Sequence, residues 1–429
     1  MRNIREEELK KEKEKIDELP VPSIQLHDAI SRGVNRGVIE QKRRYKRYTL
    51  LIAASLLCFS LIGTIRVSDT VAAFIGEIPG LEKLVIAVRG DTSLISSLYH
   101  DYLYPIDKTL DNHGKKLYID SLIVDEERIV VFYKHDSSWG KETSIIPSIK
   151  GKNSEELMYS SSFYSPASDA QENMHTLQVY FFENGPLDVG SLDFHLTNDN
   201  RKVMNTWELP IQFSEEDIIP SKEYNVKMEA VIHGQRIMVN KVKVSPTSVA
   251  ISVTSDSNNT YQFFGFENLH LQDTKGNKWL PEDSRTSSGE KDDWIFYTSS
   301  PFFENPEELY VVFDGIKAIP KNDMEVIIDV ENRKILRSPK DMNLSIKEIE
   351  GEQVVLSHIK QNEENTFMSV FGDVVDNLGN EYRISTVSSG EVPGELHYFL
   401  PQEIEGSTIT LQINGTSNVL QKETRIKVK

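Results

Sequence analysis

Residues 113–133 read HGKKLYIDSLIVDEERIVVFY, and residues 233–253 read HGQRIMVNKVKVSPTSVAISV. Each stretch starts with a His-Gly pair, and large apolar residues follow His113 and His233 at the same offsets of 4, 6, 9, 11 and 16 residues. Self-similarity at a fixed spacing is the signature of a repeated structural unit. The two stretches therefore predict that this chain contains two copies of one fold.

A second landmark keeps the same register along the chain. The motif Phe-Phe-Glu-Asn starts at Phe181, 68 residues after His113, and again at Phe302, 69 residues after His233. A His-Gly pair ahead of a strand is a turn signal, so we interpret both histidines as turn residues rather than as metal ligands.

A third, shorter copy of the unit is expected from Leu344 onward. It shares a motif with the second copy, DTKGNKW at residues 273–279 and DNLGNEY at residues 376–382. Each motif predicts a hairpin turn in which Gly or Asn supplies a positive φ and an aromatic residue re-enters the strand.

The rhythm of each copy favours an antiparallel β-sandwich. Apolar residues alternate with polar ones along short runs, which is typical of strands with one buried face. Copies of 100–120 residues have the size of an immunoglobulin-like domain. The sequence thus predicts a mainly β protein with tandem immunoglobulin-like sandwiches at residues 100–213, 214–335 and 336–429.

The longest apolar run precedes the repeats. Residues 48–65 read YTLLIAASLLCFSLIGTI and contain no charged residue. A helix of this length measures roughly 27 Å, close to the thickness of the hydrocarbon core of a bilayer. A core helix or a cleaved signal peptide would also be apolar, but neither suits five flanking cations and a preceding segment of this length. We expect one transmembrane helix at residues 48–66.

Charge gives the expected orientation of this helix. Residues 1–47 hold 13 Lys and Arg against 9 Asp and Glu, whereas the remaining residues hold 35 against 57. Positive residues collect on the cytoplasmic side of a membrane helix. The N-terminus is therefore expected in the cytoplasm and the repeats outside the cell membrane. Residues 67–99 form a juxtamembrane helical segment, with one helix around Leu84 and a second from Thr92 to about Tyr99.

The cytoplasmic segment 1–47 carries one helical apolar stripe. It recurs at intervals of four residues and consists of Leu26, Ile30, Val34 and Val38, with Arg32 and Arg36 beside it. So short a segment cannot bury the stripe in a core of its own. Either a partner protein or the membrane surface must cover it, and the absence of Trp and Phe favours a partner.

No catalytic or cofactor signature accompanies these features. The net charge of −18 argues against direct nucleic-acid binding. The sequence contains no H-E-x-x-H or C-x-x-C motif, no glycine-rich phosphate loop and only one Cys. We therefore expect no enzymatic activity, no metal, no cofactor, no catalytic residue and no small-molecule substrate.

Several motifs together resemble a known family. They are IQLHDAISRG at residues 24–33, the apolar run, the stretch IPGLEKLV with Arg89-Gly90-Asp91 after it, and DNHGKKLYIDSLI at residues 111–123. The chain resembles Bacillus-type membrane proteins with domain of unknown function 4179. Its residues 210–330, including VSPTS at residues 244–248, resemble the second uncharacterised domain that follows it there.

The resemblance implies an anti-sigma factor. In such a protein the N-terminal helix would hold an extracytoplasmic-function sigma factor at the membrane. The alternative from the residues alone is a surface-anchored adhesion or cell-wall interaction protein with no regulatory role. This chain lacks the H-x-x-x-C-x-x-C motif of zinc-binding anti-sigma domains, so the stripe alone would carry the affinity.

Overall fold

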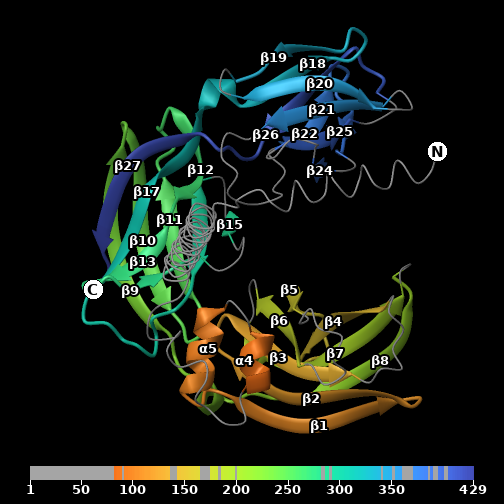
Figure 1. Ribbon diagram of the computed structural model, residues 1–429, viewed down its shortest axis with the longest axis vertical. Helices are drawn as coiled ribbons and strands as arrows, with labels where there is room; N and C mark the ends of the chain where they lie inside the picture. The colour runs from red at the N-terminus through yellow and green to blue at the C-terminus, as the bar shows by residue number, and fades with distance from the viewer. Residues whose placement is uncertain are drawn as a thin grey trace, which may run out of the picture. The chain divides into compact units, whose positions relative to one another are not determined.

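The computed structural model (Figure 1) divides into two compact units, Met1–Val67 and Ser68–Lys429, and the described residues all belong to the second. The described residues are 82–88, 91–135, 143–164, 174–181, 185–198, 201–281, 286–288, 292–339, 342–349, 353–359, 371–384, 387–389, 395–400 and 404–429. The predicted cytoplasmic segment and the predicted membrane helix lie outside these ranges. Within them, no helix is both long enough and apolar enough to span a bilayer.

Two short helices begin the described part of the chain. They are α4 (Glu82–Ala87) and α5 (Thr92–Tyr99), and α5 has the bounds that the sequence predicts. The Asp91 carboxylate caps α5, because its Oδ1 accepts a hydrogen bond from the Leu94 amide at 2.9 Å. The α5 helix is buried from Ser93 to Leu98.

The first repeat consists of two antiparallel sheets around one core. Their orders are β1-β2-β3-β6-β5 and β4-β7-β8. Leu122 from one sheet and Phe194 from the other belong to the same buried cluster. The strands are β1 (Tyr104–Asn112), β2 (Lys115–Val124), β3 (Arg128–His135), β4 (Thr143–Gly151), β5 (Tyr159–Tyr164), β6 (His175–Phe181), β7 (Val189–Asn198) and β8 (Val203–Pro210). A short 3-10 turn at Pro186–Asp188 lies between β6 and β7, and another at Glu215–Asp217 follows β8.

The second repeat has the same plan. One sheet has the order β15-β16-β11-β10-β9, and the other has the order β12-β17-β13-β14, with β27 paired to β17. The strands are β9 (Lys222–Ile232), β10 (Gln235–Val244), β11 (Val249–Ser255), β12 (Tyr261–Glu267), β13 (His270–Asp273), β14 (Lys278–Trp279), β15 (Thr286–Ser288), β16 (Asp293–Thr298), β17 (Leu309–Pro320) and β27 (Val419–Lys427).

The third repeat also consists of two sheets with a core of their own. The sheet orders are β19-β18-β26-β22-β23 and β20-β21-β25-β24. A 3-10 turn at Lys321–Asp323 leads into it. The strands are β18 (Glu325–Asp329), β19 (Lys334–Arg337), β20 (Asn343–Ile349), β21 (Gln353–Ile359), β22 (Phe371–Asp376), β23 (Glu381–Tyr382), β24 (Val387–Ser389), β25 (Glu395–Phe399) and β26 (Thr408–Ile413). The prediction of a mainly β protein with antiparallel sheets is confirmed.

The first two repeats match in backbone detail. His113 and His233 have φ values of 53° and 46°, and the glycines after them have φ values of 81° and 82°. These left-handed pairs close the hairpins β1–β2 and β9–β10, which confirms the turn role of both histidines. A further left-handed residue lies six positions before each histidine, Asp107 in one copy and Lys227 in the other.

The turns predicted at residues 273–279 and 376–382 are present as hairpins. Gly276 and Gly379 both have a φ of 90°. One oxygen of Asp376 accepts hydrogen bonds from the amides of Leu378 and Asn380, each at 2.9 Å. Asp273 makes the same pattern of contacts in its turn. The aromatic residues Trp279 and Tyr382 then lie on the returning strands.

The last strand connects the third repeat back to the second. The β27 strand pairs antiparallel with β17, and Figure 1 shows the two strands side by side. Ile426 on β27 is buried in the core of the second repeat. The sequence-based division at residues 335 and 336 stays a prediction, to which the structure adds this returning strand. The local sequence of this strand, VLQKETRIK, does not reveal which sheet the strand will join.

Candidate functional site: a buried polar junction

The site residues predicted from sequence lie outside the described residues. They are the stripe and its flanking cations, Leu26, Ile30, Val34, Val38, Arg32 and Arg36. Their part in partner binding remains a prediction. The described residues contain a different site, formed where α5 meets the first two repeats.

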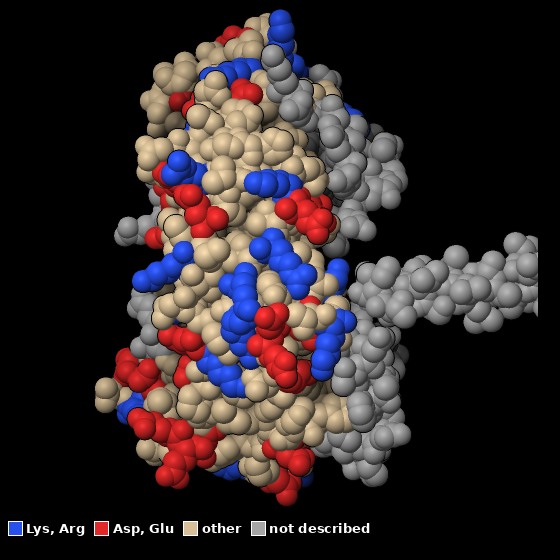
Figure 2. Space-filling model, turned by 90° about the vertical axis from the view of Figure 1, so that its left-hand side faces the viewer, with Lys and Arg blue, Asp and Glu red and all other residues tan. Residues whose placement is uncertain are grey.

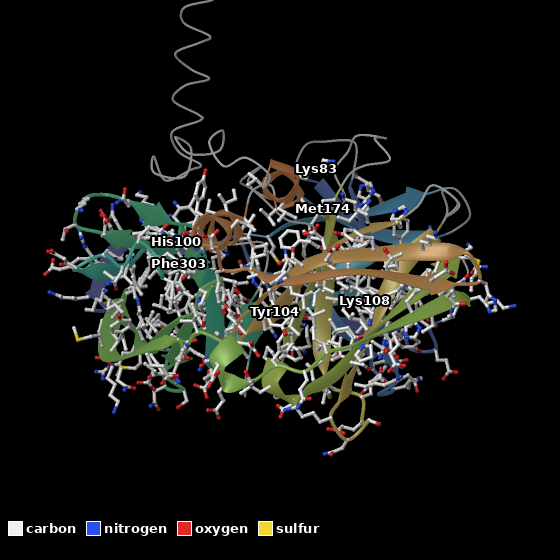
Figure 3. The ribbon with its side chains drawn as sticks, turned by 90° about the horizontal axis from the view of Figure 1, so that it is seen from below. Lys83, His100, Tyr104, Lys108, Met174 and Phe303 are labelled. Atoms are coloured by element: carbon white, nitrogen blue, oxygen red, sulfur yellow. The ribbon has the colours of Figure 1, made fainter. Side chains whose placement is uncertain are left out.

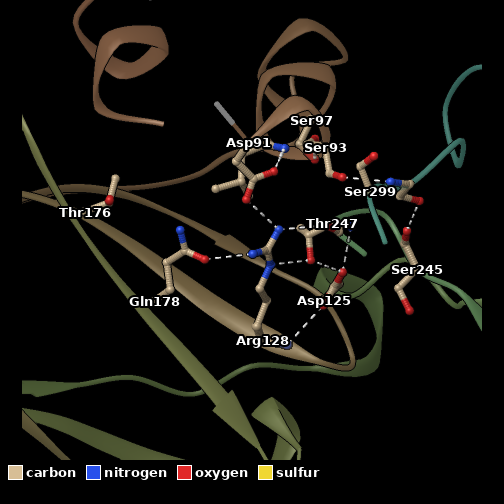
Figure 4. A network of polar contacts seen from close by, with 12 residues as sticks. Asp91, Ser93, Ser97, Asp125, Arg128, Thr176, Gln178, Ser245, Thr247 and Ser299 are labelled. Carbon is tan, nitrogen blue, oxygen red and sulfur yellow. Dashed lines mark hydrogen bonds and ion pairs between the residues drawn. The ribbon is translucent and has the colours of Figure 1, made fainter. Parts of the chain in front are cut away.

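This site is a buried polar cluster, which we call the junction (Figure 4). It consists of Asp91 before α5, Asp125 and Arg128 from the β2–β3 turn, and Ser245 and Thr247 from the β10–β11 turn. All but Asp91 are below a tenth exposed. The junction thus joins one short helix to two hairpin ends that are far apart in the sequence.

Arg128 lies at its centre and is 1% exposed. Its Nη2 contacts Asp91 Oδ2 at 3.1 Å and donates to the Thr247 carbonyl oxygen at 2.6 Å. Its Nε donates to Thr247 Oγ1 at 2.8 Å, and its Nη1 donates to Gln178 Oε1 at 2.7 Å. A buried guanidinium is costly unless its donors are satisfied, and here the donors converge on acceptors from three separate elements.

Asp125 holds the opposite charge and is completely buried. Its Oδ2 accepts from the Thr247 amide at 2.8 Å and from the Thr247 hydroxyl at 2.6 Å. Its Oδ1 accepts from the amides of Glu127 and Arg128. Because the single hydroxyl proton of Thr247 goes to Asp125, Thr247 Oγ1 must act as acceptor for Arg128. The network therefore has one defined direction of donation.

The α5 helix also contacts the second repeat directly. The Ser300 amide donates to Ser93 Oγ at 2.8 Å, and the Ser300 hydroxyl donates to the Ser245 carbonyl. Just beyond the helix, His100 stacks on Phe303 with ring centroids 4.5 Å apart, and Figure 3 shows the two rings together. Ser96 of the helix also donates from its hydroxyl to Glu304 Oε1 at 3.1 Å, so the helix is attached to the second repeat by two hydrogen bonds and by an aromatic contact just beyond its end.

The first repeat holds the other side of the helical segment. The Thr176 hydroxyl donates to the Ala87 carbonyl at the end of α4, at 3.4 Å. Tyr102, just after α5, donates from its hydroxyl to the Val124 carbonyl. Burial raises the pKa of Tyr102 well above its ordinary value, and the negative charge of Asp125 raises it further, so the phenol stays a donor. The helical segment is thereby hydrogen-bonded to the first repeat as well as to the second.

A pair of salt bridges lies at the rim between the repeats. The Lys243 ammonium of the second repeat lies 2.7 Å from Glu127 Oε1 and 2.9 Å from Glu126 Oε2 of the first. Burial alone would lower the pKa of Lys243, but the two carboxylates outweigh it and place the pKa above its ordinary value. The contact between the repeats therefore has charged groups at its edge as well as in its buried, hydrogen-bonded centre.

The junction is suited to holding α5 and the two repeats in one arrangement. Its donors and acceptors satisfy one another, which rigidifies a buried polar network and makes it specific for that arrangement. Across the described ranges, no group of three or more His, Cys, Asp or Glu side chains is placed to hold a metal ion.

Two of these residues lie in motifs that carry the family resemblance, which implies no role for them at this site. Asp91 ends the Arg-Gly-Asp motif, and Thr247 lies in the VSPTS motif. The overlooked signal was a four-residue polar run at the same place in both copies, DEER at residues 125–128 and SPTS at residues 245–248. Both runs start 12 residues after the histidine of the repeat, so they are equivalent turns.

Two family models match parts of this chain. Residues 41–137 match the family model of the domain of unknown function DUF4179, and residues 221–350 match the family of unknown function DUF5643. The first match contains Asp91, Asp125 and Arg128, and the second contains Thr247.

Among solved structures, the chain is similar to the conserved domain protein from Bacillus anthracis. The two share 16% identity at a TM-score of 0.40, over 56% of this chain and 86% of that one. No curated protein matches the chain. The family matches thus show a region similar to DUF4179 followed by a region similar to DUF5643.

Proposed function

We propose that the protein is a single-pass membrane regulator, an anti-sigma factor that sequesters an extracytoplasmic-function sigma factor. Its N-terminus lies in the cytoplasm, residues 48–66 cross the cell membrane, and immunoglobulin-like β-sandwiches lie outside. The DUF4179 match supports this, because it begins at residue 41, in the basic flank, and continues through the apolar run to the junction. The proposed protein has no enzymatic activity.

The observation that carries the proposal is the attachment of α5 to both repeats. Removing one partner of a buried ion pair typically costs about 3–5 kcal/mol. A displacement of the two repeats relative to each other must therefore either move α5 with them or break the Asp91–Arg128 pair. Only residues 67–81 separate this helical segment from the proposed membrane helix, so external strain would reach the membrane through a short connection.

The cytoplasmic stripe supplies the output in this proposal. Leu26, Ile30, Val34 and Val38 would lie in an apolar groove of the sigma factor, with Arg32 and Arg36 at the rim. Because the segment is too short to bury the stripe in a core of its own, these apolar side chains can be buried against a partner instead. Signals from the cell envelope would then act by weakening this contact.

Co-purification from bacterial membranes tests the proposal. The full-length tagged protein, solubilised in detergent, is expected to retain a sigma factor that mass spectrometry identifies. The double variant Ile30→Asp/Val34→Asp should lose it, because two buried apolar contacts become charged. A matched control, Leu9→Asp/Ile16→Asp, changes two apolar residues of the preceding charged stretch and should retain the sigma factor.

Two results would contradict the proposal. The first is equal retention by the stripe variant, which would remove the stripe as the binding face. The second is the absence of any sigma factor from the unaltered protein, combined with no change in transcription when residues 1–40 are deleted. That combination would instead favour the surface-anchored adhesion or wall-interaction protein.

A further inference from the structure

The Phe-Phe-Glu-Asn motif of the second repeat, residues 302–305, borders a small hollow that the proposed regulator does not use. Two lysines meet there from opposite ends of the repeat. Lys222 Nζ lies 3.4 Å from Asn305 Oδ1, and Lys429 Nζ lies 3.2 Å from the same oxygen. Lys222 Nζ also donates to the Phe302 carbonyl at 3.2 Å. Two ammonium groups therefore share one neutral acceptor.

Neither ammonium forms an ion pair with a carboxylate of the described residues. The contrast is Lys427, two residues before Lys429, whose Nζ lies 2.6 Å from Glu308 Oε1. Burial lowers the pKa of Lys222, and the charge of Lys429 lowers it further. Burial also lowers the pKa of Lys429. The hollow thus concentrates positive charge that the described part of the chain leaves uncompensated.

Aromatic rings hold both ammonium groups in place. Lys222 Nζ lies 4.3 Å from the centroid of the Phe302 ring, and Lys429 Nζ lies 5.7 Å from that of Tyr224. Cations are attracted to ring faces, and more strongly where water is partly excluded. The two charges are consequently positioned by the fold rather than extended freely into solvent.

The hollow opens to solvent, so an anionic group at its mouth can approach both ammonium groups. Its empty volume is about 180 Å³ including the open part, and Pro306 and Leu309 are among its apolar walls. An ammonium group has three N–H donors. Lys222 donates to two protein acceptors and Lys429 to one, so the two together keep N–H donors for a ligand.

The surrounding surface has a compatible charge. Figure 2 shows the face that carries β27, with Lys and Arg side chains gathered across its middle and acidic side chains among them. On this strand, Arg425 lies over the Tyr310 ring at 3.8 Å. Such a face in a chain of net charge −18 raises the local concentration of anions.

We propose that Lys222 and Lys429 form a binding site for a phosphate group. A phosphate monoester carries a charge of about −1.5 to −2 near neutral pH, which two ammonium groups can balance. Lysine binds phosphate as a point charge, without the bidentate geometry that arginine offers to phosphate and carboxylate alike. The phosphate could be free or esterified in a glycerol phosphate polymer or a lipid headgroup. This inference does not depend on the anti-sigma proposal.

Calorimetric titration of the full-length protein in detergent at low ionic strength tests the site. The probes are inorganic phosphate and glycerol 3-phosphate. Both Lys222→Met and Lys429→Met are expected to weaken phosphate binding by about ten- to a hundredfold, as loss of a charged hydrogen bond does. Lys427→Met is the matched control, because Glu308 already neutralises that charge, and its affinity should stay within about twofold.

A flotation assay then distinguishes the sources of phosphate. Vesicles of phosphatidylglycerol, vesicles of phosphatidylcholine and a soluble poly(glycerol phosphate) are compared with free phosphate as probes. A phosphate-bearing probe that binds the unaltered protein and is lost with Lys222→Met supports the site and identifies its source. The proposal is overturned if no probe binds, or if Lys427→Met weakens binding as much as the two site variants while all variants keep the same thermal unfolding midpoint.

Discussion

Arg128 and Thr247, 119 residues apart in the chain, are joined by two hydrogen bonds at 2.8 and 2.6 Å. They lie in equivalent turns, since β2–β3 of the first repeat and β10–β11 of the second correspond residue by residue. Each turn is closed in the same way, by a bond from the Asp125 amide to the Arg128 carbonyl and from the Ser245 amide to the Ser248 carbonyl. The two copies of one unit therefore meet through the same structural position.

The β2–β3 and β10–β11 turns carry different side chains although their backbones are closed in the same way. The first copy supplies a buried acid and a buried base, and the second supplies small hydroxyl residues that accept and donate to them. Two identical charged turns would place like charges together, which is unfavourable in a buried site. The difference makes the contact between the repeats specific and leaves the Arg128 guanidinium able to reach Asp91.

Arg128→Met tests how much the junction stabilises the protein. The substitution leaves Asp125 buried and Asp91 without its ion pair, so the free energy of unfolding should fall by about 3–5 kcal/mol. Thermal unfolding of the full-length protein measures it. The control is Arg236→Met, whose pair with Glu229 spans 3.7 Å at the surface and should contribute less than about 1 kcal/mol. Equal effects of the two variants would contradict the central position of Arg128.

Thr247 allows a finer test of the same network. In Thr247→Val the hydroxyl that donates to Asp125 and accepts from Arg128 is lost while the shape is kept. We expect a loss of about 1–3 kcal/mol, since buried polar groups lose a partner. Thr247→Ser keeps the hydroxyl and should retain most of the stability. Chemical unfolding curves measure both losses of stability. A loss in Thr247→Ser as large as that in Thr247→Val would mean that the methyl group, rather than the hydroxyl, carries the stability.

His175 predicts a pH dependence of the first repeat. Burial, together with the stacked ring of His135 at 4.8 Å, lowers the pKa of His175 to about 4. A histidine with a lowered pKa on folding binds its proton more readily in the unfolded state. Stability should therefore decrease as the pH falls from about 6.5 toward 4, and remain level above 6.5. Unfolding curves across this range measure the effect.

His175→Gln is expected to flatten this pH dependence, because glutamine does not titrate. His113→Asn is the matched control, since this histidine lies in an exposed turn where asparagine tolerates a positive φ. The interpretation is refuted if the control and the His175 variant depend on pH in the same way.

Gly315→Ala tests the return of the last strand. A Cβ at this position would lie 2.5 Å from the Leu420 carbonyl oxygen on β27. The contact involves backbone, so β27 must shift away from β17. Hydrogen exchange of the β27 amides in the full-length protein should become faster. Gly276→Ala, where the space is open and only the φ of 90° is strained, costs about 1–2 kcal/mol locally and should leave β27 protected.

Several features follow from the sequence because they rest on local physics. Alternation of apolar and polar residues predicted strands, and the His-Gly pairs predicted left-handed turns, because few residues adopt positive φ without cost. The predicted bounds of α5, Thr92 to about Tyr99, are those of the structure, whereas its cap by Asp91 became evident only there. Equal offsets from His113 and His233 exposed the duplication before any contact was known.

The junction and the lysine pair required the tertiary structure. Asp125 and Thr247, or Lys222 and Lys429, are remote in the chain, and local propensity says nothing about which turn or strand end meets another. β27 shows the same limit, because nothing in the local sequence of Val419–Lys427 reveals its pairing with β17. The sequence by itself determined the strands, the turns and the duplication, since these depend on neighbouring residues. Only the folded chain decided which charges are buried together, because that depends on how the repeats pack.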